Sequence, residues 1–297
     1  MSITSLAEQG KKNRLRIGSR ASPTHPERSF NLRVLVLYLG VHFACLGIFL
    51  TGNTWEGVRI CLVAFVIRSF ALGAGYHRYF AHRSFQTSRA MQFVFGLFGT
   101  LALEGGPLWW AETHRRHHRY ADTPEDIHSP HYQGFLYAHS GWFLDKANSK
   151  SDRSAVPDLA KYPEMIWLDE WWGYLFLPAI CALALLLRFG WSGFVWGFCV
   201  SSVLVWHATH WIQSLSHSFG GYRRFESRDQ SRNHWFVALI TLGEWHNNHH
   251  HFPWSARQGV AWWEIDIVYS ILKVMSWTGL IWDLKTPRRT TSAVARG

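Results

Sequence analysis

The stretch WWGYLFLPAICALALLLRFGWSGFVWGFCVSSVLVWHATHWI, residues 171–212, decides the fold. It is apolar over about twice the roughly 20 residues that one helix needs to cross a bilayer. We interpret it as two membrane spans, Trp171 to Phe189 and Trp191 to Ile212, that meet at Gly190; the first contains Pro178. The stretch therefore predicts an integral membrane protein.

Two further apolar runs are long enough to span, Leu32 to Leu50 and Val58 to Tyr76, and the second contains Arg68. A fifth run, Met91 to Leu103, is too short. The mean hydropathy of -0.08 conceals this clustering, whereas 18 Trp, 20 Phe and 10 Tyr are typical of a protein at a membrane interface. The sequence predicts an all-α membrane protein with four transmembrane helices.

The basic residues indicate the topology. Residues 32–285 are expected to form one membrane domain between a disordered basic N-terminal tail, 1–31, and a basic C-terminal tail, 286–297. Basic residues precede the first span and follow the last at Lys11, Lys12, Arg14, Arg16, Arg20, Arg28, Arg288, Arg289 and Arg296. The positive-inside rule then places both termini in the cytoplasm, and we expect a multi-pass protein of a bacterial inner membrane. The net charge of +10 favours contact with anionic lipid headgroups over nucleic-acid binding.

Histidines are concentrated in one part of the chain, since 16 of the 18 lie between residues 77 and 251. Three groups stand out: His77 and His82; His114, His117 and His118; His246, His249 and His250. Each triplet has the spacing i, i+3, i+4, which places its imidazoles on one face of a helix, as shared metal binding requires. His77 and His82 lie five apart, so we expect their segment to unwind or to supply ligands from a turn.

The predicted topology brings these groups to the cytoplasmic side, because the second span ends just before His77 and the fourth ends shortly before His217. His42, His207 and His210 lie within spans and are interpreted as hydrogen-bonded interior histidines. Two triplets and a pair predict a cytoplasmic helical cap that carries a dimetal site. Zinc closes its shell at four ligands and carboxylates are scarce in the groups, so two irons fit this imidazole set best.

The segments GAGYHRYFAHRSF (73–85), GTLALEGGPLWWAETHRRHHRYADTPEDIHSP (99–130) and GEWHNNHHHFPWSAR (243–257) resemble the three histidine boxes of the integral-membrane fatty acyl desaturases, of the Δ9 acyl-CoA or acyl-lipid type. The resemblance covers roughly residues 32–285 and rests on three boxes in series. It implies nine histidine ligands around two irons: His77, His82, His114, His117, His118, His217, His246, His249 and His250.

The ninth ligand, His217, comes from QSLSHSFG, residues 213–220, where Gln213 stands at the position of the family's Asn. In the family that Asn is thought to approach one iron through a water, so Gln213 is a candidate for the same role. A second departure is Glu244-Trp245-His246, where the family often has one residue more before the histidine. The backbone path into the third box is therefore in doubt, but its ligands are not.

The resemblance implies an oxygen-dependent desaturase that removes two hydrogens from adjacent methylenes while O2 is reduced to water. The cofactor carries that chemistry, and the protein supplies position and exclusion of water. Asp122, Asp126 and Glu244 either accept hydrogen bonds from ligand imidazoles or are solvated loop acids. Trp110 and Trp142 either line an acyl tunnel or anchor the protein at the interface.

Electrons must come from outside, because the chain has no fused haem, flavin or nicotinamide motif. We expect a ferredoxin, rubredoxin or cytochrome b5 type of donor with its reductase, received by basic residues such as Arg115, Arg116 and Arg119. The substrate is a fatty acyl-CoA or an acyl-lipid. Glu112 and Asp145, near the expected mouth, would repel the phosphates of CoA and favour a glycerolipid.

Two alternatives stay open at this point. A diiron lipid hydroxylase would use the same oxidant and insert oxygen into the substrate. A histidine-rich metal transporter would use histidines for passage, although transport sites normally lie near the bilayer midplane.

Overall fold

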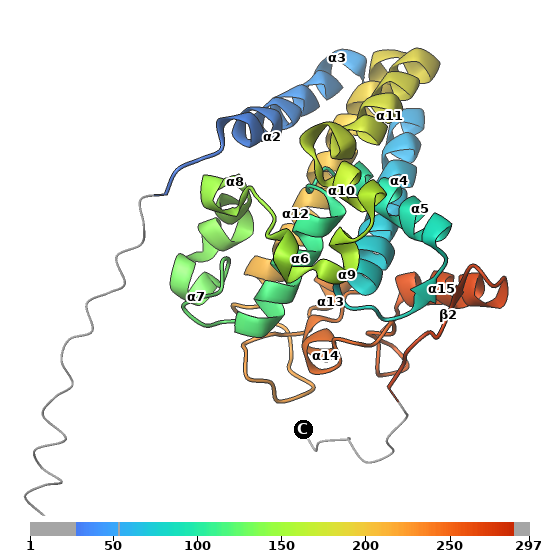
Figure 1. Cartoon of the computed structure of the whole chain (residues 1–297). Coiled ribbons are helices and arrows are strands. Elements are labelled where there is room, and N and C mark those ends of the chain that lie inside the picture. The colour runs from blue at the N-terminus through green and yellow to red at the C-terminus, as the bar shows by residue number, and fades with distance from the viewer. Residues whose placement is uncertain (1–27, 53, 288–297) are drawn as a thin grey trace, which may run out of the picture.

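The computed structural model describes residues 28–52 and 54–287 and is mostly helical (Figure 1). Its longer helices are α2 (Leu32–Ala44), α4 (Trp55–Phe70), α5 (Arg89–Gly99), α6 (Pro107–Tyr120), α11 (Trp171–Ser192), α12 (Ser201–Ser214) and α15 (Ile267–Trp277). The shorter ones are α3 (Ile48–Thr51), α7 (Pro130–Gln133), α8 (Trp142–Leu144), α9 (Pro157–Ala160), α10 (Pro163–Asp169), α13 (Trp235–Ile240) and α14 (His246–His251). Two short strands, β1 (Gln86–Thr87) and β2 (Ile281–Trp282), pair antiparallel.

The expected tails, 1–31 and 286–297, lie largely outside the described residues. Where the structure describes the end of the N-terminal one, that end pairs with the segment after α8. Phe30 forms a bridge with Asp145, and the Lys146 amide donates to the Ser29 carbonyl at 2.7 Å. Residues 29 and 30 of the expected tail therefore contact the segment after α8.

Three helical stretches among the described residues are long and apolar enough to cross a membrane: Leu32–Thr51, Trp55–Ala81 and Trp171–Ser214. The first two match the first two expected spans. The expected third and fourth spans run together in the last stretch, so the structure gives three candidate spans where the sequence predicted four.

The third stretch is broken at Gly190, whose backbone angles, φ 64° and ψ -159°, are not helical. A Cβ at Gly197 would lie 3.1 Å from Cδ1 of Leu185, although 12 residues of straight helix would separate the two by about 18 Å. The chain therefore folds back at Gly190. The expected junction at this glycine is present, and only a glycine readily adopts its left-handed φ.

The end of the second stretch differs from the expectation that it unwinds. Ala71–Ala81 is a π-helix, in which each amide bonds to the carbonyl five residues earlier rather than four. The amide of His82, at its C-cap, donates to the carbonyl of His77 at 3.2 Å. Unwinding was the wrong expectation for His77, because the wider helix places positions five apart near the same face. The alternative, a ligand supplied from a turn, is confirmed for His82, which lies in the turn at the C-cap.

Helix α6 is fixed at both ends. The carboxylate of Asp169 accepts from the amides of Leu108 and Trp109 at 3.1 and 2.8 Å, which satisfies donors that a helix start leaves free. A Cβ at Gly106 would lie 2.3 Å from the Asp169 Cα, so a side chain there would displace this cap. Near the other end, Arg115 donates to the carbonyls of Phe80 and Ala81 and thereby ties α6 to the end of the π-helix.

Helix α14 has only six residues and depends on buried side chains around it. The Asn233 amide oxygen accepts from the Asn247 and Asn248 amides at 2.8 and 3.2 Å. Asn248 in turn donates to the carboxylate of Glu264 at 3.0 Å. Six residues are too few for a stable helix in isolation, so this network is what holds the third histidine box in place.

Beneath the boxes lies an apolar core formed by the π-helix, α5, α6, α10 and α15. Phe80, Leu108, Met165, Leu168 and Leu272 are almost fully buried in it. Each such side chain stabilises the fold by about 1.5–3 kcal/mol relative to exposure. The histidine-bearing elements thus rest on a packed, rigid base.

Candidate metal centre

Five histidines converge in one group: His77, His82, His114, His118 and His249. Their Nε2 atoms follow one another in the order His77, His249, His118, His114 and His82. The successive Nε2–Nε2 distances are 2.9, 2.9, 3.0 and 2.9 Å. They come from the π-helix and its C-cap, from α6 and from α14.

Four more histidines form a second group beside it: His117, His217, His246 and His250. The Nε2 atoms of His217 and His246 lie 2.8 Å apart, and those of His117 and His250 lie 3.4 Å apart. His217 follows α12 in a turn rather than lying within the helix. The structure therefore brings all nine predicted histidines together, five in one group and four in the other.

Each i, i+3, i+4 triplet divides between the two groups. On α6, His114 and His118 face the first group and His117 the second; on α14, His249 faces the first and His246 and His250 the second. The expectation that a triplet shares one metal was wrong, because both helices run alongside the pair of groups and present a different edge to each. Each helix thus fixes the spacing between the groups as well as their histidines.

Carboxylates hold the outer nitrogens of the second group. Each of the four imidazoles donates from Nδ1 to one carboxylate. The pairs are His117 with Asp126 at 3.2 Å, His217 with Asp122 at 2.7 Å, His246 with Glu244 at 3.3 Å and His250 with Asp229 at 2.8 Å. Glu244 also accepts from Nδ1 of His77, in the first group, at 3.2 Å. A carboxylate at Nδ1 sets the tautomer and leaves a lone pair on Nε2.

The charges in the site support metal binding. Burial raises the pKa of Asp122, Asp126 and Glu244, but their histidine partners outweigh it and hold each pKa below its usual range. Burial lowers the pKa of His82, His114, His118 and His249 well below the usual value, so these imidazoles are neutral. Neutral imidazoles whose Nε2 atoms converge within 3.0 Å repel one another unless a cation lies between them, and metal ligands must be deprotonated in this way. The residues present therefore fit two transition-metal ions.

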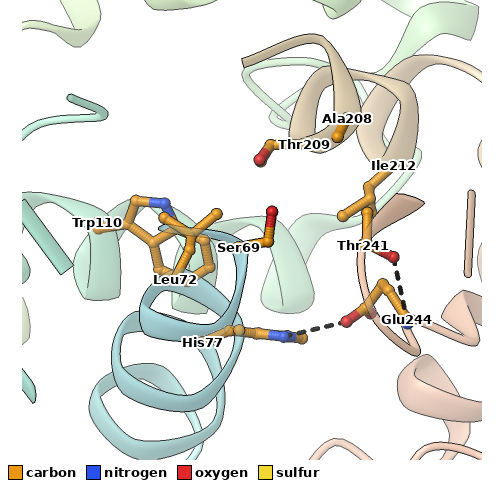
Figure 2. A pocket seen from close by; sticks show the side chains of 10 residues that line it. Ser69, Leu72, His77, Trp110, Ala208, Thr209, Ile212, Thr241 and Glu244 are labelled. Atoms are coloured by element: carbon orange, nitrogen blue, oxygen red, sulfur yellow. Dashed lines mark hydrogen bonds and ion pairs between the residues drawn. The ribbon is translucent and has the colours of Figure 1, made fainter. Parts of the chain in front are cut away.

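A cavity of about 50 Å³ opens beside the first group. It is lined by Ser69, Leu72, Gly73, His77, Trp110, Ala208, Thr209, Ile212, Thr241 and Glu244. Figure 2 shows Trp110 and Leu72 on one side, Ala208 and Ile212 on another, and the His77–Glu244 pair across the cavity. An apolar wall with few polar groups is typical of a site for an apolar ligand.

The remaining predicted residues lie as follows. Trp110 lines the cavity and stacks on His114 with ring centroids 4.8 Å apart. Trp142 is not among the lining residues; it stacks on Trp109 at 5.9 Å and donates to the side-chain oxygen of Gln213 at 3.2 Å. The amide of Gln213 is thus engaged with an indole that faces the second box.

Two further residues near the groups were not among the predicted site residues, although His128 lies in the segment that resembles the second box. Asp229 lies in a loop without a motif, and only the fold brings it to His250. His128 is buried with its Nδ1 3.5 Å from Asp126 and its ring 4.4 Å from that of His117. Asp145, expected near the mouth, is buried and accepts a hydrogen bond from Tyr137 at 2.8 Å, so it is not available to repel a substrate.

Comparisons with known proteins agree with this geometry. The family model described as fatty acid desaturase matches residues 53–276. The sn-1 stearoyl-lipid 9-desaturase of Anabaena variabilis is 37% identical over 272 residues, 89% of this chain and 97% of that protein. Delta-9 acyl-lipid desaturase 1 of Arabidopsis thaliana is 36% identical over 255 residues, 84% of this chain and 81% of that protein. An acyl-CoA C20 Delta5-desaturase of Anemone leveillei is 37% identical over 260 residues, 85% of this chain and 81% of that protein.

Proposed function

The chain belongs to the fatty acid desaturase family and is a fatty acyl desaturase, and from that premise we propose that it inserts a cis double bond at carbon 9 of a saturated acyl chain carried by a membrane lipid. The observation that carries the proposal is the apolar cavity that opens onto His77 of the five-histidine group. Two relatives whose names specify lipid-linked chains and position 9 support the carrier and the position.

We propose two irons as the resident metals, held by the five-histidine and four-histidine groups. Iron at such a centre supplies the oxidation of unactivated C–H bonds with O2. The chain's own part is to orient the imidazoles through Asp122, Asp126, Asp229 and Glu244, and to keep water out by burial. In the overall reaction two hydrogens leave adjacent methylenes, and O2 is reduced to two waters with two further electrons and two protons.

The cavity supports an acyl chain as substrate. Leu72, Ala208 and Ile212 offer apolar contacts along its walls, and Trp110 offers a flat aromatic face next to His114. Contacts of this kind bind a methylene chain by removing apolar area from water. Trp110 is the residue proposed to position the chain against the metal groups.

We also propose that the fold at Gly190 is the turn of a transmembrane hairpin, which gives four spans, with both termini and the histidine groups in the cytoplasm of a bacterial cell. The exposed Trp191 would then face the opposite side from the exposed Lys150. In intact cells a membrane-impermeant thiol reagent is expected to label Trp191→Cys and to label Lys150→Cys only after permeabilisation. Labelling of both, or of neither, before permeabilisation would contradict this topology.

An external electron donor of the ferredoxin, rubredoxin or cytochrome b5 type is proposed to dock at α6. Arg116 and Arg119 are exposed on this helix. Arg115, expected beside them, is instead engaged in an ion pair with Asp158 at 2.7 Å. We therefore assign the docking charge to Arg116 and Arg119 alone.

The test is expression in a host that lacks unsaturated lipids, followed by mass spectrometry of the separated lipid classes. The expected product has lost two hydrogens, carries its double bond at carbon 9 and appears first in glycerolipid. His118→Ala should give no product. A gain of oxygen would indicate a hydroxylase instead, and metal uptake without a lipid product would indicate a transporter.

A further inference from the structure

Four histidines outside the two metal groups form a separate cluster: His42 from α2, His139 from the π-helical turn Tyr137–Gly141, and His207 and His210 from α12. His207 lies at its centre. Its Nε2 is 3.2 Å from Nε2 of His42, and its Nδ1 is 2.9 Å from Nε2 of His139. These separations match those between imidazoles in the two metal groups.

The tautomers on one side of the cluster follow from its hydrogen bonds. Nδ1 of His42 lies 2.7 Å from the carbonyl oxygen of Tyr38, and because a carbonyl only accepts, this nitrogen must carry the hydrogen. In a neutral imidazole the other nitrogen is then bare. Nε2 of His42 therefore accepts from Nε2 of His207, which leaves Nδ1 of His207 as a free lone pair aimed at His139.

The same reasoning applies on the other side. The Ser214 hydroxyl donates to the carbonyl of His210 at 2.8 Å, so its oxygen accepts from Nδ1 of His139 at 2.9 Å. Nε2 of His139 is therefore also a bare lone pair. Burial and the neighbouring His207 lower the pKa of His139 to about 4, so at neutral pH no extra proton is held on this ring.

Two bare lone pairs that face each other at 2.9 Å repel unless a cation lies between them. His210 supplies a third nitrogen, since one ligand atom from each of His139, His207 and His210 lies within 4.8 Å of the other two. Nδ1 of His210 lies 3.1 Å from the Ser140 hydroxyl, so Nε2 is the nitrogen that remains to bind the ion.

We propose that His139, His207 and His210 bind a third metal ion, of the zinc class, separate from the two irons. Three imidazoles with an open fourth position suit zinc, and hard cations are disfavoured because the cluster contains no carboxylate among the residues that the structure describes. His42 orients His207 through its outer nitrogen without binding the ion. The ion joins the segment before α8 to α12 and, through His42, to α2.

Zinc added at one equivalent to the purified, iron-loaded protein tests the proposal. Elemental analysis after gel filtration is expected to show one zinc per chain with both irons retained. X-ray absorption at the zinc edge is expected to show three imidazoles at about 2.0–2.1 Å. Zinc that had replaced iron would instead show the four or five imidazoles of the other groups, together with loss of iron. Absence of bound zinc, or zinc bound only in place of iron, overturns the proposal.

His139→Asn should lose the zinc while it keeps two irons. The matched control, His131→Ala, removes an exposed histidine on α7 from the same part of the chain and should keep all three ions. Cobalt in place of zinc gives a second readout, because a four-coordinate cobalt spectrum should appear in the wild type and in His131→Ala but not in His139→Asn. Equal zinc in both variants would refute the assignment. The absorption experiment on the wild-type protein decides the case if His139→Asn does not fold.

Discussion

Glu244 contacts histidines of both metal groups. Glu244→Gln should therefore weaken metal binding, although it replaces only one carboxylate oxygen by an NH2 group. One carboxylate oxygen accepts from Nδ1 of His77 at 3.2 Å, and the other accepts from Nδ1 of His246 at 3.3 Å. Glutamine offers one accepting oxygen and one NH2 group. The NH2 group must face an N–H of one of the two imidazoles, so one histidine loses its partner.

The expected size of the effect follows from the lost bond. A hydrogen bond to a charged group contributes about 1.5–3 kcal/mol, and loss of a group that orients a metal ligand typically weakens metal binding about 10- to 100-fold. We expect an effect of this size at one of the two irons. The other iron should be weakened less, because its histidine keeps a neutral hydrogen bond in place of a charged one.

The assay is titration of the purified, iron-loaded protein with a chelator, with retained iron measured at each concentration. Glu244→Gln should release its first iron at about 10- to 100-fold lower chelator concentration than wild type. Glu125→Gln, the same change at an exposed acid in the loop after α6, is the control and should titrate like wild type. A Glu244→Gln protein that also titrates like wild type would show that Glu244 does not hold the centre together.

Three further predictions concern other parts of the chain. Arg68 is buried and donates to the Ser202 hydroxyl, so Arg68→Leu should lower the yield of folded protein and its melting temperature in detergent; unchanged values would show that the charge is dispensable. Burial raises the pKa of Glu104 from 4.5 to about 8. Between these two pKa values the unfolded chain binds fewer protons than the folded one. The free energy of unfolding should therefore fall by up to about 1.4 kcal/mol per pH unit as the pH rises from the lower value to the higher. Glu104→Gln should remove this slope in melting curves recorded across the same range. Gln213→Leu deprives the Trp142 indole of its acceptor. If the amide supports the four-histidine group, this variant should lose about 10- to 100-fold in turnover, whereas Gln213→Asn should lose less. Equal turnover and iron content in the two variants would exclude Gln213 from the site.

Much of the site could be predicted from local sequence. The spacing of His114, His117 and His118 indicated a helix that presents its imidazoles together, and α6 carries them in this way. The division of each triplet between two groups could not be predicted. It depends on where the π-helix and α14 lie relative to α6, and that is decided by long-range contacts such as the bonds of Arg115 to Phe80 and Ala81.

The π-helix shows a different limit. A separation of five between His77 and His82 does not fit an α-helix, so the expectation was that the segment unwinds or supplies its ligands from a turn. The structure keeps the helix and changes its hydrogen-bond register, and most residues of Ala71–Ala81 are buried. The surrounding packing that selects this register is not visible in the segment itself. The ion pair of buried Arg78 with Asp266, at 2.9 Å, is one such contact.

The placement of acids explains how a four-histidine group can stand beside a five-histidine group. Each of the four imidazoles in the smaller group donates its outer N–H to a carboxylate, whereas in the larger group, over the part of the chain that the structure describes, only His77 does so. A carboxylate at the outer nitrogen makes the imidazole a stronger donor to a metal. Three of these acids, Asp122, Asp126 and Asp229, serve the smaller group alone and add negative charge next to it. The four-histidine group therefore has fewer ligand nitrogens, but these nitrogens are more basic than those of the five-histidine group. Glu244 contacts histidines of both groups, so a change in its contact with one group alters its contact with the other.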